Sequence, residues 1–286
     1  MLETILVVGA NGQLGSEIKA ISKEFKKYNF IFTDAATLNI TQLNDLQLFV
    51  EDKTINYIIN CAAYTNVDKA EEESELAKKI NDVAVENLVK VAEKNSIKLI
   101  HVSTDYVFDG KSFLPLKETD ATNPIGVYGE AKRAGELHLI NSKIEYLILR
   151  TSWLYSNYNN NFVKTIQRLA TERDSLGIIA DQVGTPTYAA DLAKTILTIL
   201  QQLNEQNKGV YHFSNEGVAS WYDFAKEIVT ISNIECQINP IETKDYKTLA
   251  ERPSYSVLNK AKIKNVFNVE IAYWKDALIR CLKESV

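Results

Sequence analysis

The fold is decided near the start of the chain by Ile5-Leu6-Val7-Val8-Gly9-Ala10-Asn11-Gly12-Gln13-Leu14-Gly15. Residues 5–8 form a short apolar run typical of a buried strand, and a helical pattern extends from residue 16 to residue 25. Glycines at such a junction permit a tight turn and a close approach of backbone to a pyrophosphate, while the helix N-terminus supplies free N–H groups. The stretch therefore predicts a dinucleotide-binding turn, with a plain strand-to-helix turn as the alternative.

The rest of the N-terminal half alternates strands with helices. Strands are predicted at residues 30–33, 57–60, 99–102 and 146–149, and helices at 41–52 and 67–95. This alternation predicts an α/β fold with a doubly wound, Rossmann-like parallel sheet, whose ligands bind beyond the C-terminal strand ends. The groups predicted to meet at that edge are the glycine turn, Asp34, Ala62-Ala63 and Ser103-Thr104.

The second half lacks this regular alternation. Helices are predicted at residues 162–173, 189–203, 221–231 and 274–284, and a strand at 209–213. We expect these elements to build a smaller α/β lobe that binds the substrate. The expected division gives residues 1–150 and about 175–205 to the dinucleotide-binding domain, and about 151–174 and 206–286 to the substrate-binding lobe.

Composition excludes several classes of function. The 286 residues are 45% hydrophobic and 24% charged, which is ordinary for a globular protein. The net charge of -5, with acids and bases interspersed, gives no footprint for nucleic acid. No apolar segment approaches the length of a membrane span and no leader precedes the first strand, so we expect a cytoplasmic protein without membrane contact. The three cysteines show no metal-ligand spacing, which predicts no metal site.

A candidate proton donor lies on the helix predicted after residue 126. Tyr128 and Lys132 are four residues apart, so a helix places both side chains on one face. An ammonium favours the phenolate, which predicts a lowered pKa for Tyr128 and proton transfer near neutral pH. Thr104, at a strand end, could bind the same oxygen. The ordinary alternative is a half-buried tyrosine beside a solvated lysine, and a second such pair occurs at Tyr222 and Lys226.

A carboxylate follows the second predicted strand. Asp34 lies about 20 residues past the glycines, where an acidic residue binds the hydroxyl groups of the adenosine ribose. It would repel a 2′-phosphate, and the neutral residues Ala35-Ala36-Thr37 follow it. We therefore expect NADH to be used at least as well as NADPH.

These features, in this order, resemble the extended short-chain dehydrogenase/reductases and, more narrowly, the dTDP-4-dehydrorhamnose reductase family. The segments that carry the resemblance are Gly12-Gln13-Leu14-Gly15, residues 62–71, 103–110, 127–132, 150–155 and 181–187, and Arg252-Pro253. They span nearly the whole chain and are specific together, although the Tyr-x-x-x-Lys pattern alone belongs to the entire superfamily.

The resemblance implies a reaction. A hydride would pass from NADH or NADPH to C4 of dTDP-4-dehydro-L-rhamnose, giving dTDP-L-rhamnose. The implied catalytic residues are Thr104, which would bind the substrate oxygen, Tyr128, which would protonate the new alkoxide, and Lys132, which would hold the nicotinamide ribose.

The resemblance, together with the strand-end positions, also assigns binding residues. Those for the cofactor are Gly9, Asn11, Gly12, Gln13, Leu14, Asp34, Asn39, Ile40, Ala62, Ala63, Tyr64, Thr65, Val102, Tyr128 and Lys132. Those for the substrate are Thr104, Asp105, Tyr128, Trp153 and Arg252. A guanidinium such as that of Arg252 suits a diphosphate, whereas Trp153 taken alone could equally be a core aromatic residue.

Some positions depart from the family pattern. Asn39 stands where the family usually has an aspartate, so a hydrogen-bonding group is kept and a charge is lost. Some family members bridge a dimer through a metal held by glutamates. Glu17 matches one such position, but Ala190 stands where a second acid would help. We therefore expect no metal and leave a homodimer open.

Two other functions remain as alternatives. An epimerase or dehydratase of the same family would return the hydride to its product, and a dehydratase would be expected to have glutamate where Tyr106 follows Asp105. A non-catalytic regulatory subunit with this fold would tend to lose the pair formed by Tyr128 and Lys132. Stoichiometric consumption of NAD(P)H with dTDP-4-dehydrorhamnose distinguishes the reductase from both.

Overall fold

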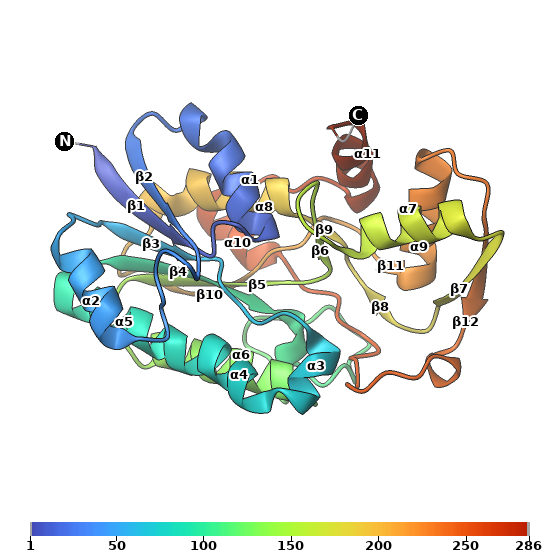
Figure 1. The fold of residues 1–286 in the computed structure, drawn as a ribbon, viewed down its shortest axis with the longest axis horizontal. Coiled ribbons are helices and arrows are strands. Elements are labelled where there is room, and N and C mark those ends of the chain that lie inside the picture. The colour runs from blue at the N-terminus through green and yellow to red at the C-terminus, as the bar shows by residue number, and fades with distance from the viewer. Residues whose placement is uncertain (1, 285–286) are drawn as a thin grey trace.

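The computed structural model describes residues 2–284. A six-stranded sheet lies at its centre (Figure 1), in the order β10-β5-β4-β3-β1-β2 and with every pairing parallel. The strands are β1 (Glu3–Val8), β2 (Tyr28–Thr33), β3 (Tyr57–Asn60), β4 (Lys98–Thr104), β5 (Tyr146–Thr151) and β10 (Gly209–His212). All six residues of β5 are buried, as expected of a strand covered on both faces. The predicted doubly wound parallel sheet is confirmed.

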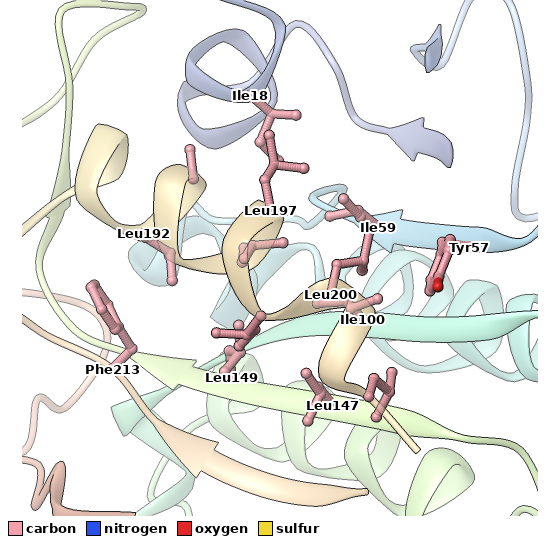
Figure 2. Packing of buried hydrophobic residues seen from close by; sticks show 14 of the residues in the cluster. Ile18, Tyr57, Ile59, Ile100, Leu147, Leu149, Leu192, Leu197, Leu200 and Phe213 are labelled. Atoms are coloured by element: carbon pink, nitrogen blue, oxygen red, sulfur yellow. The ribbon is translucent and has the colours of Figure 1, made fainter. Parts of the chain in front are cut away.

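Helices cover both faces of this sheet (Figure 1). One face packs against α1 (Gln13–Ile21), α8 (Ala189–Ile199), the 3₁₀ turn η4 (Leu200–Gln202) and α10 (Ala261–Phe267). Another 3₁₀ turn, η1 (Ser22–Glu24), follows α1. The other packs against α2 (Leu43–Glu51), α5 (Ala84–Asn95) and α6 (Val127–Ile140). Figure 2 shows Leu197 of α8 and Ile18 of α1 over Ile59 of the sheet. Burying each such side chain contributes about 1.5–3 kcal/mol.

A smaller lobe lies at one end of the sheet (Figure 1). Its helices are α7 (Phe162–Glu172), α9 (Trp221–Ile231) and α11 (Trp274–Glu284), with the 3₁₀ turn η5 (Thr243–Asp245). Its paired strands are β7 (Ser175–Ile179) with β12 (Gln237–Ile241), β8 (Val183–Gly184) with β11 (Ala219–Ser220), and β6 (Leu154–Tyr155) with β9 (Thr187–Tyr188). The lobe has its own aromatic core, in which Phe224 contacts Tyr155, Phe162 and Trp274.

Two strands pair with strands of the other domain, not of the domain to which they were assigned from the sequence. β10, assigned to the lobe, is the edge strand of the large sheet, and Phe267 of α10 packs against its Tyr211. β7, assigned to the dinucleotide-binding domain, pairs with β12 in the lobe. Apolar periodicity identifies a strand but not its distant partner, so these two assignments are corrected. The division as a whole stays a prediction.

The single helix predicted over residues 67–95 is divided. It consists of α3 (Val67–Glu72), α4 (Ser74–Lys78), the π-helical segment η2 (Lys79–Val83) and α5. Glu73 interrupts it with a non-helical backbone, φ -107° and ψ 42°. Apolar residues keep a helical spacing on both sides of Glu73, so periodicity alone could not reveal the break. A short 3₁₀ turn, η3 (Asp105–Val107), follows β4 and completes the elements around the site.

A buried ion pair joins α6 to the sheet. Arg150 of β5 donates from Nε to Oε1 of Glu136 at 2.8 Å and from Nη2 to Oε2 at 2.7 Å. Arg133 adds a third hydrogen bond to Glu136 at 2.8 Å. Burial alone would raise the pKa of the Glu136 carboxyl, but the bonds and charge of Arg150 outweigh it, and the pKa is lowered. The carboxylate is therefore ionised where α6 meets β5.

Glu136→Gln should destabilise the protein by about 3–5 kcal/mol at neutral pH, because it leaves a buried guanidinium without its counter-charge. This loss of stability should be complete above about pH 4.3, the pKa of a glutamate in the unfolded chain. It should shrink as pH falls through the lowered pKa that Glu136 has in the folded protein. Urea unfolding at several pH values measures it. Glu172→Gln, which breaks the exposed pair with Arg168 on α7, is the matched control and should cost less than about 1 kcal/mol. Equal losses in the two variants would refute the assigned role.

Candidate active site

The glycine turn after β1 has the geometry that a dinucleotide requires. Gly9 adopts φ +74°, and a Cβ there would lie 2.5 Å from the backbone nitrogen of Ala62. A Cβ on Gly15 would lie 2.5 Å from the carbonyl oxygen of Gly9. No side chain within residues 2–284 caps the N-terminus of α1 at Gly12. The backbone N–H groups of its first turn are thus left for an anion.

A cavity of about 480 Å³ opens beside this turn. Of the predicted cofactor residues, its lining includes Gly9, Asn11, Gly12, Asp34, Asn39, Ile40, Ala62 and Ala63. The others, Gln13, Leu14, Tyr64, Thr65, Val102, Tyr128 and Lys132, lie outside its lining. The remaining walls come from Val8, Ala35, Leu38, Thr41, Cys61, Leu76, Lys79 and Ile80. Leu76 and Ile80 are four residues apart, the spacing of one helical turn, and neither of them was assigned to the site from the sequence.

Asp34 is held in place before any ligand binds. Its Oδ1 accepts hydrogen bonds from the Thr37 hydroxyl at 2.9 Å, from the Thr37 N–H at 3.0 Å and from the Ala36 N–H at 3.1 Å. The hydrogen bonds from Thr37 lower the pKa of this carboxyl, so it is ionised. Its Oδ2 accepts from the Asn11 amide. A ribose hydroxyl at this position would share Oδ2 with Asn11.

The loop after β3 is fixed by residues that the sequence did not identify. Asn81 of η2 accepts from the Tyr64 N–H and donates to the Tyr64 carbonyl, both at 2.9 Å. The Tyr64 phenol donates to Glu73 Oε2 at 2.6 Å, so its hydroxyl is directed to α3–α4 and not to the cavity. Glu71 accepts from the N–H of Val127 at 3.0 Å and so holds the first turn of α6. All these contacts join distant segments, which no local spacing predicts.

The lobe also contacts the glycine turn. Asn159 Nδ2 donates to the Asn11 carbonyl at 2.7 Å, and Asn161 Nδ2 donates to Gln13 Oε1 at 3.1 Å. Asn161 is the N-cap of α7, where its side chain accepts from the Lys164 N–H. One residue thus joins the start of a lobe helix to the predicted cofactor turn.

Tyr128 lies in the first turn of α6, half-buried and edge-on to the ring of Tyr106 at a centroid distance of 5.4 Å. Burial raises its pKa to about 12, against the opposing effect of a hydrogen bond with Thr104, and the charge of Asp105 raises it further. The predicted lowering by Lys132 is wrong for this structure. At neutral pH the phenol is protonated and is therefore in the form that can donate.

Lys132 shows why that prediction fails. Its ammonium donates to the Val102 carbonyl at 2.7 Å and lies 3.4 Å from Nε2 of His101. Helical spacing places two residues on one face but does not fix the direction of a long side chain. Burial lowers the pKa of Lys132 to about 8, partly offset by the carboxylate of Glu136.

Thr104 and Asp105 lie together at the end of β4. The Thr104 hydroxyl donates to Asp105 Oδ1 at 3.0 Å and accepts from the Tyr106 N–H at 3.2 Å. Both side chains are buried, and Asp105 is 2% exposed. Burial raises the pKa of the Asp105 carboxyl to about 6. The sequence predicted Thr104 at this strand end, and the resemblance added Asp105 as a substrate-binding residue.

Trp153 follows β5 with a strained backbone. Its φ of +49° is a left-handed conformation that costs a bulky residue about 1–3 kcal/mol. The indole stacks on Trp221 at 3.6 Å with an interplanar angle of 9°. A Cβ on Gly184 would lie 2.7 Å from the Trp153 ring, so only glycine leaves room for this arrangement. Trp221 was not predicted as a site residue. It is the first residue of α9, between Ser220 and Asp223, which form the capping box of this helix.

Arg252 already has a partner. Its Nη2 donates to Asp68 Oδ2 at 2.6 Å and its Nη1 to Oδ1 at 3.1 Å. Asp68 lies in the first turn of α3, so this bidentate pair connects the large sheet domain to the C-terminal segment. A role for Arg252 with a diphosphate stays a prediction, and it would require the guanidinium to leave Asp68 or to share it.

Ala190, which stands where a second metal-binding acid would help, is followed in α8 by Asp191, whose carboxylate is already paired. Asp191 accepts from both Arg280, at 2.6 Å, and Asn215, at 2.7 Å. Glu17 is buried in α1. Within residues 2–284 no group of three or more His, Cys, Asp or Glu side chains could hold a metal ion. No helix in that range is long and apolar enough to cross a membrane.

Comparisons with known proteins agree with this geometry. The family described as the RmlD substrate binding domain matches residues 3–286. A dTDP-4-dehydrorhamnose reductase of Aggregatibacter actinomycetemcomitans is 40% identical over 284 residues, or 96% of each chain. The solved dTDP-4-dehydrorhamnose reductase of Clostridium acetobutylicum superposes with a TM-score of 0.94 at 39% identity, covering 98% of this chain and 99% of its own. That of Bacillus anthracis, solved in complex with NADP, also gives 0.94, at 37% identity and with 99% and 100% covered.

Lys132→Met should make the folded chain more stable at pH 7, by about 1–3 kcal/mol, because it removes a buried charge whose desolvation opposes folding. Below about pH 8, the pKa of Lys132 in the folded protein, the buried ammonium destabilises the wild type in full. This destabilisation disappears as pH rises toward about 10.4, the pKa of lysine in the unfolded chain. The stability gained by Lys132→Met should therefore shrink between these two pH values. Urea unfolding at pH 7 and pH 10 measures it. Lys226→Met, at the exposed lysine of the second Tyr-x-x-x-Lys pair, should change stability by less than about 0.5 kcal/mol. A less stable Lys132→Met protein would contradict the argument.

Proposed function

The chain belongs to the dTDP-4-dehydrorhamnose reductase family, and on this premise we propose that it catalyses the NAD(P)H-dependent reduction of the C4 keto group of dTDP-4-dehydro-L-rhamnose to dTDP-L-rhamnose. The observation that carries the proposal is a protonated phenol, Tyr128, beside Thr104 and Asp105, at the edge of the sheet where the glycine turn opens its cavity. The test is consumption of one NAD(P)H per molecule of dTDP-4-dehydrorhamnose.

The residues present fit a nicotinamide dinucleotide. The cradle that Gly9 and Gly15 form without side chains suits the pyrophosphate, and Asp34 suits the adenosine ribose. Lys132 would hold the nicotinamide ribose after turning from the Val102 carbonyl. When bound, the reduced nicotinamide supplies a hydride.

The proton for the reaction comes from a side chain of the protein. As charge develops on the C4 oxygen, Tyr128 donates its proton and becomes a phenolate. Thr104 would orient the same oxygen, and the apolar surface of Trp153 on Trp221 would form a wall for the sugar. Burial of these groups excludes water and so strengthens their interactions with the developing charge.

The alternatives have weaker support. Solved dehydratases such as the dTDP-glucose 4,6-dehydratase of Bacillus anthracis are 18% identical, which shows a common fold alone. Tyr106 follows Asp105 where the dehydratase pattern expects glutamate. The intact pair of Tyr128 and Lys132 opposes a purely regulatory role.

Two further statements belong to this proposal. We place the enzyme in the cytoplasm, where nucleotide sugars and reduced nicotinamide cofactors are available. A homodimer is left to measurement, by sedimentation of the purified chain at several concentrations.

Tyr128→Phe should lower kcat by about 10²–10⁴-fold, the usual value of general acid catalysis, and should leave cofactor affinity nearly unchanged because only the phenol oxygen is removed. Steady-state kinetics and cofactor titration by fluorescence measure the two effects. Tyr222→Phe, in the second Tyr-x-x-x-Lys pair, is the matched control and should keep full activity. A Tyr128→Phe enzyme with more than a tenth of the wild-type rate would rule out the donor role.

Asp34→Ala should shift cofactor preference toward NADPH, because the carboxylate repels a 2′-phosphate and binds a 2′-hydroxyl. Asp34 is only partly buried, so solvent screens the repulsion and the preference of the wild type for NADH should be mild, about fivefold or less. Comparison of kcat/KM for both cofactors in both proteins measures the shift. A preference for NADPH in the wild type that the substitution leaves unmoved would show that Asp34 does not face the ribose.

A further inference from the structure

We infer that Asp105 supplies, through the hydroxyl of Thr104, the proton that restores Tyr128 after each turnover. The inference deepens the proposed function and rests on it. Every reduction leaves Tyr128 as a phenolate inside the site. Unless a proton reaches that oxygen, the next substrate finds no donor.

The Thr104 hydroxyl interacts with both of the other side chains. On one side, its interaction with the Tyr128 oxygen opposes the rise in the pKa of that phenol. On the other side its hydroxyl donates to Oδ1 of Asp105 at 3.0 Å. A hydroxyl has one proton and two acceptor sites. While Thr104 donates to Asp105 and accepts from the Tyr106 N–H, its remaining site can only accept, so Tyr128 must be the donor of its bond with Thr104.

Protonation of Asp105 reverses this order. A neutral carboxyl donates to Thr104, whose own proton then points to the Tyr128 oxygen. The chain of bonds can thus have either direction with little movement of heavy atoms. This reversibility is what a proton relay requires, since each oxygen both receives and passes a proton.

The surroundings of the Asp105 carboxyl favour its protonated form. Its side chain is 2% exposed, and Oδ2 has no hydrogen-bond partner among residues 2–284. An unpaired buried carboxylate oxygen costs free energy that protonation relieves. Burial accordingly raises the pKa of Asp105 to about 6, although the neighbouring hydroxyls of Ser256 and Thr104 oppose the rise. Both forms are therefore present near neutral pH.

The ionisable groups that face Asp105 are neutral or already paired. Tyr106, on the same 3₁₀ turn, has a pKa raised chiefly by burial. Tyr128 of α6 is likewise protonated. Beyond Tyr106, Arg252 and Asp68 form a bidentate pair with each other. The titration that matters in this pH range is therefore that of Asp105 itself.

The transfer balances. The O–H bond of Tyr128 breaks as its proton joins the C4 oxygen of the sugar, leaving the phenolate. The Thr104 proton passes to that phenolate, and the Asp105 proton passes to Thr104. Asp105 becomes a carboxylate and takes a proton from solvent when product leaves. No oxidant or reductant is needed for this step, and its net input is one proton.

Asp105→Asn tests the relay, because an amide can accept from Thr104 but cannot supply a proton. With enzyme, NADH and dTDP-4-dehydrorhamnose mixed by stopped flow, the first turnover uses the proton that Tyr128 already holds. We expect the steady-state rate of this variant to fall about 10²-fold below its own first-turnover rate, giving a burst, whereas the wild type shows no such difference between the two rates. A first turnover slowed as much as the steady state would overturn the inference, since a residue that merely binds or positions substrate affects both.

The pH dependence supplies a second readout. The wild-type kcat should fall as pH rises through the pKa of Asp105, about 6, because the neutral acid is required. Asp105→Asn should lose this fall. Ser256→Ala keeps the carboxyl and removes a hydroxyl that lowers its pKa, so the fall should move to higher pH. The relay would be overturned if both Ser256→Ala and Asp105→Asn kept the pH dependence of kcat that the wild type shows.

Infrared difference spectroscopy of the free enzyme gives a readout without turnover. The wild type minus Asp105→Asn difference should show a protonated carboxyl band that titrates near pH 6. A carboxyl that stays ionised down to pH 5 would refute the relay. A wild-type enzyme that consumes no NADH with this substrate would instead refute the proposed function, so the two failures are distinguishable.

Discussion

The candidate site depends on the buried ion pair between Glu136 and Arg150. Glu136 lies on α6 one turn after Lys132 and two turns after Tyr128, and Arg150 lies on β5, next to β4. A bidentate pair without water tolerates little displacement, because any shift exposes an unpaired charge to a low dielectric. The pair therefore fixes how α6 lies over the sheet, and so where Tyr128 stands relative to Thr104.

The same burial sets the protonation states that the chemistry needs. It raises the pKa of Tyr128 and of Asp105, and it lowers the pKa of Lys132. Each shift disfavours the charged form, yet the three groups reach different states at neutral pH because their starting values differ. Burial thus keeps Tyr128 protonated at neutral pH. The same burial brings the pKa of Asp105 and the pKa of Lys132 close to neutral pH.

The sequence was sufficient to predict the features that depend on local motifs or on the periodic spacing of apolar residues. It predicted the parallel sheet and the meeting of the glycine turn, Asp34, Ala62-Ala63 and Ser103-Thr104 at one edge, because strand ends of a parallel sheet share an edge. The family resemblance was needed to add Asp105 to the site. It could not predict partners far along the chain, such as Trp221 for Trp153 or β12 for β7. The pKa of Tyr128 was mispredicted for a related reason: helical spacing gives a common face but neither burial nor the direction of a lysine.

The pairing of Arg252 with Asp68 shows how two parts of the chain can meet at a site and still exchange partners. Their side chains are 21% and 36% exposed, unlike the fully buried pair of α6 and β5. At such exposure water can solvate a released carboxylate, and the pair itself contributes at most about 1 kcal/mol. If Arg252 binds the diphosphate of the substrate, one bidentate oxyanion replaces another at little cost. The rigid pair then holds the chemistry in place, and the exposed pair is the one free to respond to ligand.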